Sequence, residues 1–348
     1  MHTTVARPSL PISVLIPTRN SMVYLPRHLE SMKEWLPLVE EVVVVDSESN
    51  DGTVEFLKKQ LGLQSARFFA HPPGLYQSWN FGIAQCVGKY VYLSTVGDSI
   101  TRPGLECLVE TADAFDCDVV ISPPRIVDEQ GDEVSKRWPI FDLIKALRLA
   151  SPVTLNGPDT LLFALISLHQ AILGSSASNL YRADCLKRAP FPTDFGRGGD
   201  VGWGLRYGAE TKLGVVPKVF STFVLHSKLY QARDYWVENV AEKRLITARD
   251  TIARKAWRQH AGVILNEAAF ENLSNKMLIA WSEFSLAQRR IRTRQKSRRR
   301  FLSPSAWGEY WKLAQKLNVL RVAQRRGWKW IDRSIRGSAR SITPASLQ

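Results

Sequence analysis

Short apolar runs alternate with amphipathic segments along the first third of the chain. Residues 12–16 and 41–45 are rich in β-branched side chains, as expected of strands that are buried on both faces. Between them, apolar residues recur at helical spacing: Leu25, Leu29, Met32 and Leu36. We expect Asn20 or Ser21 to cap this helix and Pro26 to lie near its first turn. A strand, a helix and a strand in this order predict a parallel βαβ unit.

The same alternation continues further along the chain. It predicts helices from about residue 53 and near 77–87, and strands near 67–69, 89–94, 118–122, 213–216 and 219–225. The pattern is weaker from 123 to 174, where we expect loops and a helix pair over the sheet. The fold class predicted is therefore α/β, with a doubly wound, mostly parallel sheet that carries helices on both faces. After about residue 233 the chain is predicted to be helical to its end, with a break at 303–305.

Charge separates this last region from the rest. The net charge is +14 over 348 residues, and residues 289–340 hold 17 Lys and Arg against only Glu309 and Asp332. That segment has a local charge of +15, so the remainder sums to about −1. We therefore expect a near-neutral domain over 1–232, with a first half at about 11–122 and a second half at about 123–232, and a basic helical extension over 233–348.

Other bulk features point to a cytoplasmic protein. Four cysteines lack the spacing of a metal site or a disulfide framework, and we interpret them as reduced thiols. Residues 1–10 lack the apolar run of a signal peptide, and the longest apolar stretch, 161–173, is too short to cross a bilayer. The chain is therefore predicted to be peripheral at most.

Polar residues gather where the predicted strands end, which is where ligands bind in doubly wound sheets. Asp46 closes the second strand, and its carboxylate can accept hydrogen bonds from a base or a ribose. Asp51 precedes a glycine and a helix start, and we favour a capping role for it. Asp46 could equally cap a turn. Asp98 follows the strand at 89–94, where a diphosphate-bound Mg²⁺ or Mn²⁺ would find a hard oxygen ligand.

Three runs together resemble glycosyltransferase family 2 on the GT-A fold: ISVLIPTRN at 12–20, DSESNDGT at 46–53 and WNFGIAQCVGKYVYLSTVGD at 79–98. Their order and spacing match the family over about 11–98, and the resemblance resumes at 173–226. It implies an inverting enzyme that uses a nucleotide sugar, with UDP sugars favoured. The residues expected to bind the nucleotide are Pro17, Thr18, Arg19, Asn20, Asp46, Ser49, Asn80 and Gly97.

The acidic cluster departs from the family. Thr95 and Gly97 stand where the family has acidic residues, so Asp98 alone matches the metal-binding position. The resemblance still implies a divalent metal, Mn²⁺ or Mg²⁺, as cofactor. It also implies a second ligand, His226, at the end of the strand 219–225, because neutral imidazole can bind Mn²⁺. A histidine at a strand end can also be purely structural.

The resemblance makes 1–232 a catalytic domain, with a nucleotide-binding half at about 11–122 and an acceptor half at about 123–232. The acceptor half resembles the family segment that carries the general base. Asp200 matches the family's aspartate, while Gly199 replaces the preceding glutamate. An alcohol is a poor nucleophile, and a carboxylate within hydrogen-bond reach can remove its proton as the new bond forms. The resemblance implies that Asp200 is this base. The alternative is that Asp200 caps the helix that begins beside it.

These features predict transfer of a sugar to an acceptor hydroxyl on a glycan or a lipid-linked molecule, in cell-envelope polysaccharide or glycolipid synthesis. The thinned acidic cluster keeps open an inactive nucleotide-sugar-binding or scaffold protein. A sugar-phosphate nucleotidyltransferase would carry a glycine-rich loop where Pro17–Asn20 stands. The basic residues beside aromatics at 289–340 suit an anionic membrane surface, with a solvated or partner-docking helix as the alternative. Nothing else suggests nucleic-acid binding.

Overall fold

A computed structural model describes residues 10–62, 66–167, 170–226 and 304–339. Its main sheet has eight strands in the order β3-β2-β1-β4-β9-β6-β10-β8. The strands are β1 (Leu10–Thr18), β2 (Val39–Asp46), β3 (Ala66–Ala70), β4 (Tyr90–Leu93), β6 (Val119–Ile121), β8 (Val153–Leu155), β9 (Asn179–Arg182) and β10 (Leu213–Val215). The strand β9 is antiparallel to both β4 and β6, and β8 is antiparallel to β10, whereas the other neighbours are parallel. The predicted fold class is confirmed.

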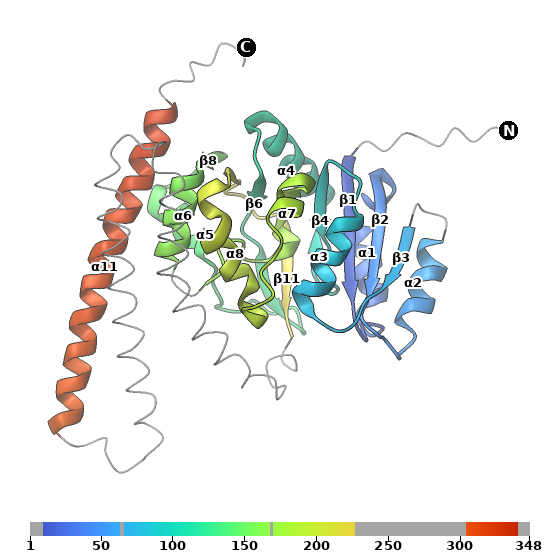
Figure 1. Cartoon of the computed structure of the whole chain (residues 1–348), viewed down its shortest axis with the longest axis horizontal. Coiled ribbons are helices and arrows are strands. Elements are labelled where there is room, and N and C mark those ends of the chain that lie inside the picture. The colour runs from blue at the N-terminus through green and yellow to red at the C-terminus, as the bar shows by residue number, and fades with distance from the viewer. Residues whose placement is uncertain (1–9, 63–65, 168–169, 227–303, 340–348) are drawn as a thin grey trace.

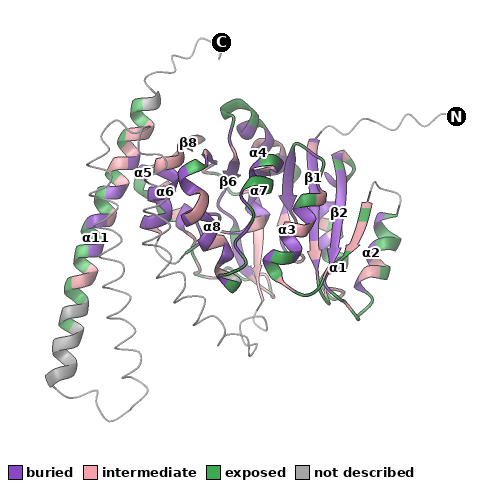
Figure 2. Cartoon of the chain, viewed as in Figure 1, coloured by how far each residue is buried: buried purple, intermediate pink, exposed green. Residues whose placement is uncertain are grey.

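Helices cover both faces of this sheet (Figure 1). They are α1 (Leu25–Met32), α2 (Thr53–Leu61), α3 (Leu75–Gln85), α4 (Arg102–Phe115), α5 (Pro139–Leu147), α6 (Gly157–Ile166), α7 (Ala183–Arg188), α8 (Gly199–Tyr207) and α11 (Pro304–Ala339). Successive side chains of a strand point to opposite faces. Accordingly, Val14 and Val44 pack with α1, α2 and α4, whereas Leu15 and Val43 pack with α3 and α5 to α8. The central strands β1 and β2 are therefore buried on both sides, whereas the edge strand β3 is partly exposed (Figure 2).

The start of α1 differs from the prediction. Its N-cap is Tyr24, which makes no side-chain capping bond, and Pro26 lies in the first turn as expected. Asn20 instead accepts a hydrogen bond from the Asn50 amide at 2.9 Å. Ser21 contributes its carbonyl to the turn that precedes the helix, accepting from Tyr24 N at 2.9 Å. The loop after β1 is thus tied to the loop after β2, and its polar side chains serve that link and not the helix.

A second, three-stranded sheet lies across the carboxyl ends of the first. It contains β5 (Ser99–Ile100), β7 (Arg125–Asp128) and β11 (Ser221–Leu225), in the order β5-β11-β7. Because β5 and β11 are antiparallel, with Thr222 opposite Ser99, the residue before β5 approaches the end of β11. The residue before β5 is Asp98, and the residue after β11 is His226. This small sheet therefore brings His226 over Gly97, in the loop that carries Asp98, 128 positions earlier in the chain.

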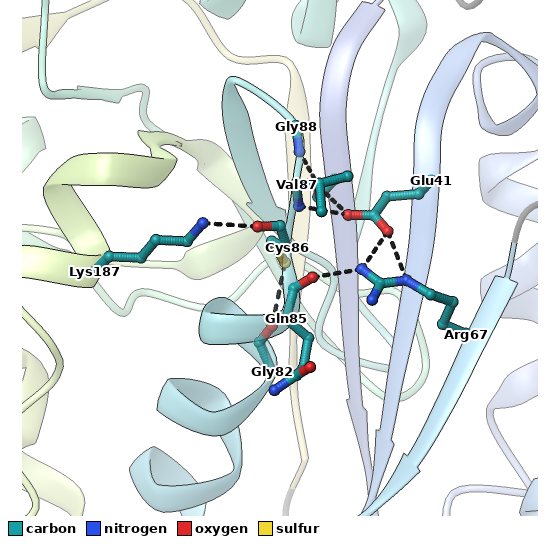
Figure 3. Close-up of polar contacts among 9 residues, drawn as sticks. Glu41, Arg67, Gly82, Gln85, Cys86, Val87, Gly88 and Lys187 are labelled. Atoms are coloured by element: carbon teal, nitrogen blue, oxygen red, sulfur yellow. Dashed lines mark hydrogen bonds and ion pairs between the residues drawn. The ribbon is translucent and has the colours of Figure 1, made fainter.

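At the opposite, amino-terminal edge of the main sheet, Glu41 anchors a polar cluster (Figure 3). Its carboxylate accepts hydrogen bonds from Ser13 Oγ at 2.5 Å and from Val87 N at 2.8 Å, and it pairs with Arg67. Arg67 also donates to the carbonyl of Gln85. These contacts join β1, β2, β3 and the turn before β4 at one point. A buried carboxylate with this many donors is fully satisfied, so we interpret the cluster as structural.

The long helix α11 packs against the side of the domain formed by α5, α6 and β8 (Figure 1). Leu320 and Ile331 are buried in this contact, and the ring of Trp328 lies 5.9 Å from that of Phe163. Ser334 Oγ donates to the Asp159 carboxylate at 2.5 Å. Buried and exposed positions alternate along α11 (Figure 2). Trp328 thus packs on the catalytic domain, which differs from the membrane-facing aromatic side chain expected from the sequence.

Two smaller expectations meet the structure directly. The four cysteines are free thiols, as predicted. Within the described segments, no helix combines the length and apolar character that a membrane span requires. The basic run at 289–300 and the rest of 227–303 lie outside the described residues, so the expectation for that part of the extension stays a prediction.

Candidate active site

The nucleotide-binding residues expected from the sequence lie together at the carboxyl ends of β1 and β2. Thr18 and Asp46 are register partners on these two strands. The Asp46 carboxylate accepts from Ser49 Oγ at 2.5 Å and from Ser49 N at 2.9 Å, and Ser49 Oγ in turn accepts from Asn20 N at 2.8 Å. These bonds hold the two loops in one arrangement. The Thr18 hydroxyl is buried and has no hydrogen-bond partner in the described part of the chain.

Other predicted residues of this group differ in their surroundings. Arg19 is exposed and Pro17 is half-buried at the same edge. Asn80, on α3, uses both ends of its amide on the backbone of Phe191: Nδ2 donates to the carbonyl at 2.8 Å, and Oδ1 accepts from the amide at 2.9 Å. Asn80 therefore fixes the segment that leads to Asp200. Asp51 accepts from Thr53 N at 3.1 Å, in agreement with its predicted capping role.

Asp98 is buried and held rigidly. Its Oδ2 accepts from Thr95 Oγ1 at 2.6 Å, and its Oδ1 accepts from the Val224 amide at 2.9 Å. Burial raises the pKa of this carboxyl to about 7, although the bonds from Thr95 and Val224 oppose the rise. A buried carboxylate is stabilised by a nearby cation, because the cation compensates for lost hydration. The geometry at Asp98 thus suits a group that receives positive charge.

A second histidine supports the loop that carries Asp98. The Nδ1 of His28 lies 3.0 Å from the Asp98 carbonyl oxygen, and its Nε2 lies 3.1 Å from Ser94 Oγ. Burial lowers the pKa of His28 to about 4, so its imidazole is neutral at neutral pH. A neutral ring donates through one nitrogen and accepts through the other, which matches a carbonyl on one side and a hydroxyl on the other. Sequence analysis missed this positioning residue.

His226 lies directly over Gly97. A Cβ atom built on Gly97 would be 2.8 Å from His226 Nε2, and Gly97 has a φ of +102°. Glycine is thus required here twice, by its backbone conformation and by the imidazole above it. The other ring nitrogen of His226, Nδ1, lies 3.4 Å from a carboxylate oxygen of Glu129. A carboxylate behind a histidine is the usual outer partner of a metal-binding imidazole.

These positions can be compared with the needs of a divalent metal. The described residues include no group of three or more His, Cys, Asp and Glu side chains arranged to hold a metal ion. However, Mg²⁺ bound with a substrate diphosphate commonly uses only one or two protein carboxylates, and phosphate oxygens and water complete its shell. Asp98 supplies a hard oxygen, and the His226 imidazole, which lies over the neighbouring Gly97 with Glu129 3.4 Å from its Nδ1, supplies a nitrogen at the same loop. The donor set therefore fits a metal that arrives with the donor.

Asp200 lies in the first turn of α8. Its Oδ1 accepts from the Val201 amide at 2.7 Å, and its carboxylate also accepts a hydrogen bond from the Tyr76 hydroxyl. Burial raises its pKa to about 6, and both hydrogen bonds limit that rise. The carboxylate is consequently ionised at neutral pH and close to the pKa at which a general base is effective.

The residue before Asp200 explains a departure from the family. A Cβ atom on Gly199 would collide with the Pro192 carbonyl and with the ring of Tyr76. The family's glutamate therefore has no room at this position. The space is filled by Tyr76, whose ring stacks on that of Phe191 with centroids 5.3 Å apart. Tyr76 is a further site residue that the sequence pattern did not reveal.

Lys136, between β7 and α5, carries a charge that acts on both carboxylates. Burial raises the pKa of Asp98 and of Asp200, and the charge of Lys136 makes a small opposing contribution to each. A hydrogen-bond chain also runs from the Asp98 side toward the acceptor half, since Thr95 Oγ1 lies 3.1 Å from Ser176 Oγ. Lys136 and Glu129 belong to the region of weak sequence pattern, and no motif marks them.

Comparisons with known proteins show the family and the fold to which this chain is similar. Residues 13–168 match the family model described as Glycosyl transferase family 2. No curated protein matches the chain. Among solved structures, S. aureus TarS 1-349 aligns with a TM-score of 0.53 at 16% identity, covering 94% of this chain and 91% of that chain. TarS 1-349 in complex with UDP-GlcNAc aligns with a TM-score of 0.53 at 17% identity, covering 94% and 92%. At these identities the likeness shows the fold.

The family match and the fold together define a glycosyltransferase of the GT-A type. The match over residues 13–168 confirms the resemblance to glycosyltransferase family 2 for the motifs up to Asp98, whereas the part of the resemblance at 173–226 lies beyond the matched residues and stays a prediction.

Proposed function

We propose that this glycosyltransferase moves a sugar from a nucleoside-diphosphate sugar to an acceptor hydroxyl, with inversion at the anomeric carbon. The observation that carries the proposal is the position of the His226 imidazole over Gly97, in the loop that holds the buried Asp98 carboxylate. The charge of Lys136 acts on both Asp98 and Asp200. Such an arrangement suits a reaction with two different needs. The leaving diphosphate of the donor gains negative charge and needs positive charge nearby, and the acceptor hydroxyl loses a proton and needs a base.

The acceptor step belongs to Asp200. Its ionised carboxylate takes the proton of the acceptor hydroxyl as the oxygen attacks the anomeric carbon from the face opposite the diphosphate. Tyr76 and the Val201 amide fix the carboxylate and leave little freedom for it to turn away. Positioning of this kind lowers the entropy cost of the reaction. The acceptor proposed is a glycan or a lipid-linked molecule of the cell envelope.

The donor end belongs to the edge formed by β1, β2 and Asp98. Thr18 and Asp46 are proposed to receive the nucleoside; the unpartnered Thr18 hydroxyl offers it a hydrogen bond. Asp98 and His226 would hold a Mn²⁺ or Mg²⁺ ion. When bound, that metal supplies positive charge against the diphosphate oxygens. UDP sugars are the first donors to test, because a TarS structure of the same fold is a complex with UDP-GlcNAc.

The test is turnover of UDP, GDP and dTDP sugars by the purified chain, with the anomeric configuration of the product read by NMR. Asp200→Asn should lower turnover by at least about 100-fold while nucleotide binding persists. The matched control is Asp194→Asn, because Asp194 lies in the same segment but is exposed and pairs with Arg206 at 2.6 Å. A scaffold protein would bind a nucleotide sugar and show no turnover in any variant.

The acid limb of the pH profile gives an independent check on the base. Because the base must be deprotonated, activity should rise as pH increases through about 6, the pKa to which burial raises Asp200. The measurement is kcat/KM between pH 4.5 and 8, with folding followed by circular dichroism at each pH. A flat profile across this range in the folded protein would remove Asp200 from the role of base.

We also infer that the basic extension binds an anionic membrane surface. In the described helix α11, exposed cations fall on the side away from the domain: Arg321, Arg325, Arg326, Lys329, Arg333 and Arg336. Each basic side chain near an anionic surface contributes about 1 kcal/mol to binding, so this group is sufficient for reversible attachment. The contact that places the enzyme at a lipid-linked acceptor would then be electrostatic.

Vesicle sedimentation tests this attachment. The full chain should bind phosphatidylglycerol vesicles and not pure phosphatidylcholine vesicles, and salt should release it. Replacing Arg325, Lys329 and Arg333 by Gln should weaken binding. Replacing Arg27, Lys58 and Lys59, which are exposed on α1 and α2, removes the same charge elsewhere and serves as control. Equal weakening by both triple variants would show that net charge matters and the α11 surface does not.

A further inference from the structure

Lys136 is held in place by two aromatic rings. Its Nζ lies 4.9 Å from the centroid of Trp138 and 5.2 Å from that of Phe223. The two rings themselves meet edge to face, with centroids 4.7 Å apart. An ammonium group near two π faces is attracted to both. The long side chain is therefore restrained in one region, although the segment around it, between β7 and α5, has no regular structure.

The ring of Phe223 places the Lys136 ammonium group near the proposed donor end of the site. Phe223 lies on β11, immediately before Val224, whose amide donates to Asp98 at 2.9 Å. It lies three residues before His226. Trp138, the other anchor, packs near Gly174, whose added Cβ would lie 3.4 Å from the indole ring. Lys136 is thus fixed by the same strand that positions Asp98, and its charge reaches Asp200 as well.

The local balance of charge differs from that implied by the family pattern. Thr95 and Gly97 remove two negative charges from the acidic cluster, and Lys136 adds a positive one beside it. A site with fewer carboxylates binds a metal ion less firmly. A weakly bound metal neutralises less of the charge that develops on the departing diphosphate. A lysine ammonium is a compact charge with three donors, which suits phosphate oxygens.

We propose that Lys136 contacts the distal phosphate of the bound nucleoside diphosphate and neutralises the leaving group as the sugar departs. The bond between the anomeric carbon and the phosphate oxygen breaks, and its electron pair stays on that oxygen, facing Lys136. The bond to the acceptor oxygen forms, and the proton passes to Asp200. This inference rests on the proposed donor site, and it assigns to a lysine part of the charge that a metal would otherwise neutralise alone.

Calorimetric binding without divalent metal, in EDTA, isolates this contact. We expect Lys136→Gln to weaken UDP binding by about tenfold or more, the effect of losing one charge-assisted hydrogen bond, and to leave UMP binding unchanged. Lys136→Arg keeps the charge and should retain part of the UDP affinity. The matched control is Lys218→Gln, because Lys218 also lies over a ring, 5.0 Å from the Phe220 centroid, but precedes β11 at the end far from His226.

Different failures have different meanings. If UDP binds Lys136→Gln as tightly as it binds the wild type, the inference is overturned and the donor site stands. If Lys136 only keeps Asp200 ionised, the acid limb of the activity profile will move to higher pH in Lys136→Gln with UDP affinity unchanged, which also overturns it. If the folded wild type binds none of UDP, GDP and dTDP, with or without Mn²⁺, then the proposed function itself fails. Thermal melting of each variant confirms that it is folded.

Discussion

Two buried carboxylates lie at opposite ends of the strands of one sheet, and they differ in their charged partners. Glu41 and Asp98 are each 6% exposed. Glu41 has an arginine partner, a hydroxyl donor and a backbone donor. Asp98 has a hydroxyl and a backbone donor, and no ion pair with any residue that the structure describes. Burial raises the pKa of Asp98 to about 7.

The difference shows what burial alone does not reveal. A buried charge that already has its counter-ion inside the protein locks elements together, because any rearrangement would strand both charges. A buried charge that lacks such a counter-ion keeps a free energy cost that a ligand can relieve. At the amino-terminal end of the sheet the buried carboxylate therefore has its partners within the chain, whereas at the carboxyl-terminal end we propose that a bound ligand compensates the charge of Asp98. Substitutions at the two edges should separate stability from activity.

The largest effect on stability is expected at Glu41, at the amino-terminal end of the sheet. Glu41→Ala leaves the buried Ser13 hydroxyl and the Val87 amide without their acceptor, and Arg67 without its counter-ion, so the free energy of unfolding should fall by about 2 kcal/mol. Urea unfolding measures this loss. Activity per folded molecule should be unchanged. Glu30→Ala is the control, since its pair with Lys33 is exposed and is worth at most about 0.5 kcal/mol. A loss of turnover without a loss of stability at Glu41 would break the comparison.

At the other edge, Asp98→Asn should reverse this outcome. Asparagine keeps the shape: its Oδ1 can accept from the Val224 amide, and its Nδ2 can donate to the Thr95 hydroxyl, which reverses that bond. It also removes a buried charge that has no ion pair among the described residues. Stability in metal-free buffer should be equal to or higher than that of the wild type, while turnover falls by about 100-fold or more because the donor end loses its anionic ligand. Thermal melting in EDTA and initial-rate assays measure the two quantities. A drop in stability like that of Glu41→Ala would show that Asp98 is structural.

A third buried carboxylate, Asp159, extends the comparison, and the smallest change in stability is expected there. It is 5% exposed, and its partner Ser334 belongs to α11. Burial raises its pKa from 3.8 to about 6, so the folded state binds the proton more tightly than the unfolded state. The resulting stability is fully present below about pH 3.8 and is lost as pH rises through about 6.

Asp159→Asn should therefore be more stable than the wild type above pH 6, on the order of 1 kcal/mol, and the gap should close toward pH 4. Thermal melting between pH 4 and 8 measures it. Ser334→Ala, which removes the hydroxyl donor but leaves the charge, is the matched control and should be less stable than the wild type at pH 7.5. A gap that does not change with pH would show that α11 does not bury this carboxylate.

Much of the fold was predictable because it is encoded locally. The runs that became β1 and β2 are β-branched and buried, and the helix from Thr53 follows a turn in which Asp51 accepts from the Thr53 amide. The strands β7 and β8 were not predicted. They have four and three residues, too short to carry a periodic pattern, and exist because partners distant in sequence, β11 and β10, lie beside them. The antiparallel position of β9 between β4 and β6 also depends on contacts between segments that are distant in sequence.

The candidate site divides in the same way. Asp46, Asp98 and Asp200 stand in motifs and were found by order and spacing. Tyr76, Glu129 and Lys136 stand in no motif, because their roles arise only when separate elements meet: a ring in the space beside Gly199, a carboxylate behind an imidazole and a cation on two rings. Their surroundings, and not their neighbours in sequence, decide what they do.

The glycine beneath His226 has a consequence for any attempt to redesign this enzyme. An engineer who wished to restore the family's carboxylate at position 97 would need that residue to adopt a left-handed backbone, and the imidazole would have to swing off its Glu129 support. In this backbone the extra carboxylate and the seated histidine exclude each other. Reconstruction of the acidic motif therefore requires at least two coordinated changes, in which the loop is reshaped before the charge is added.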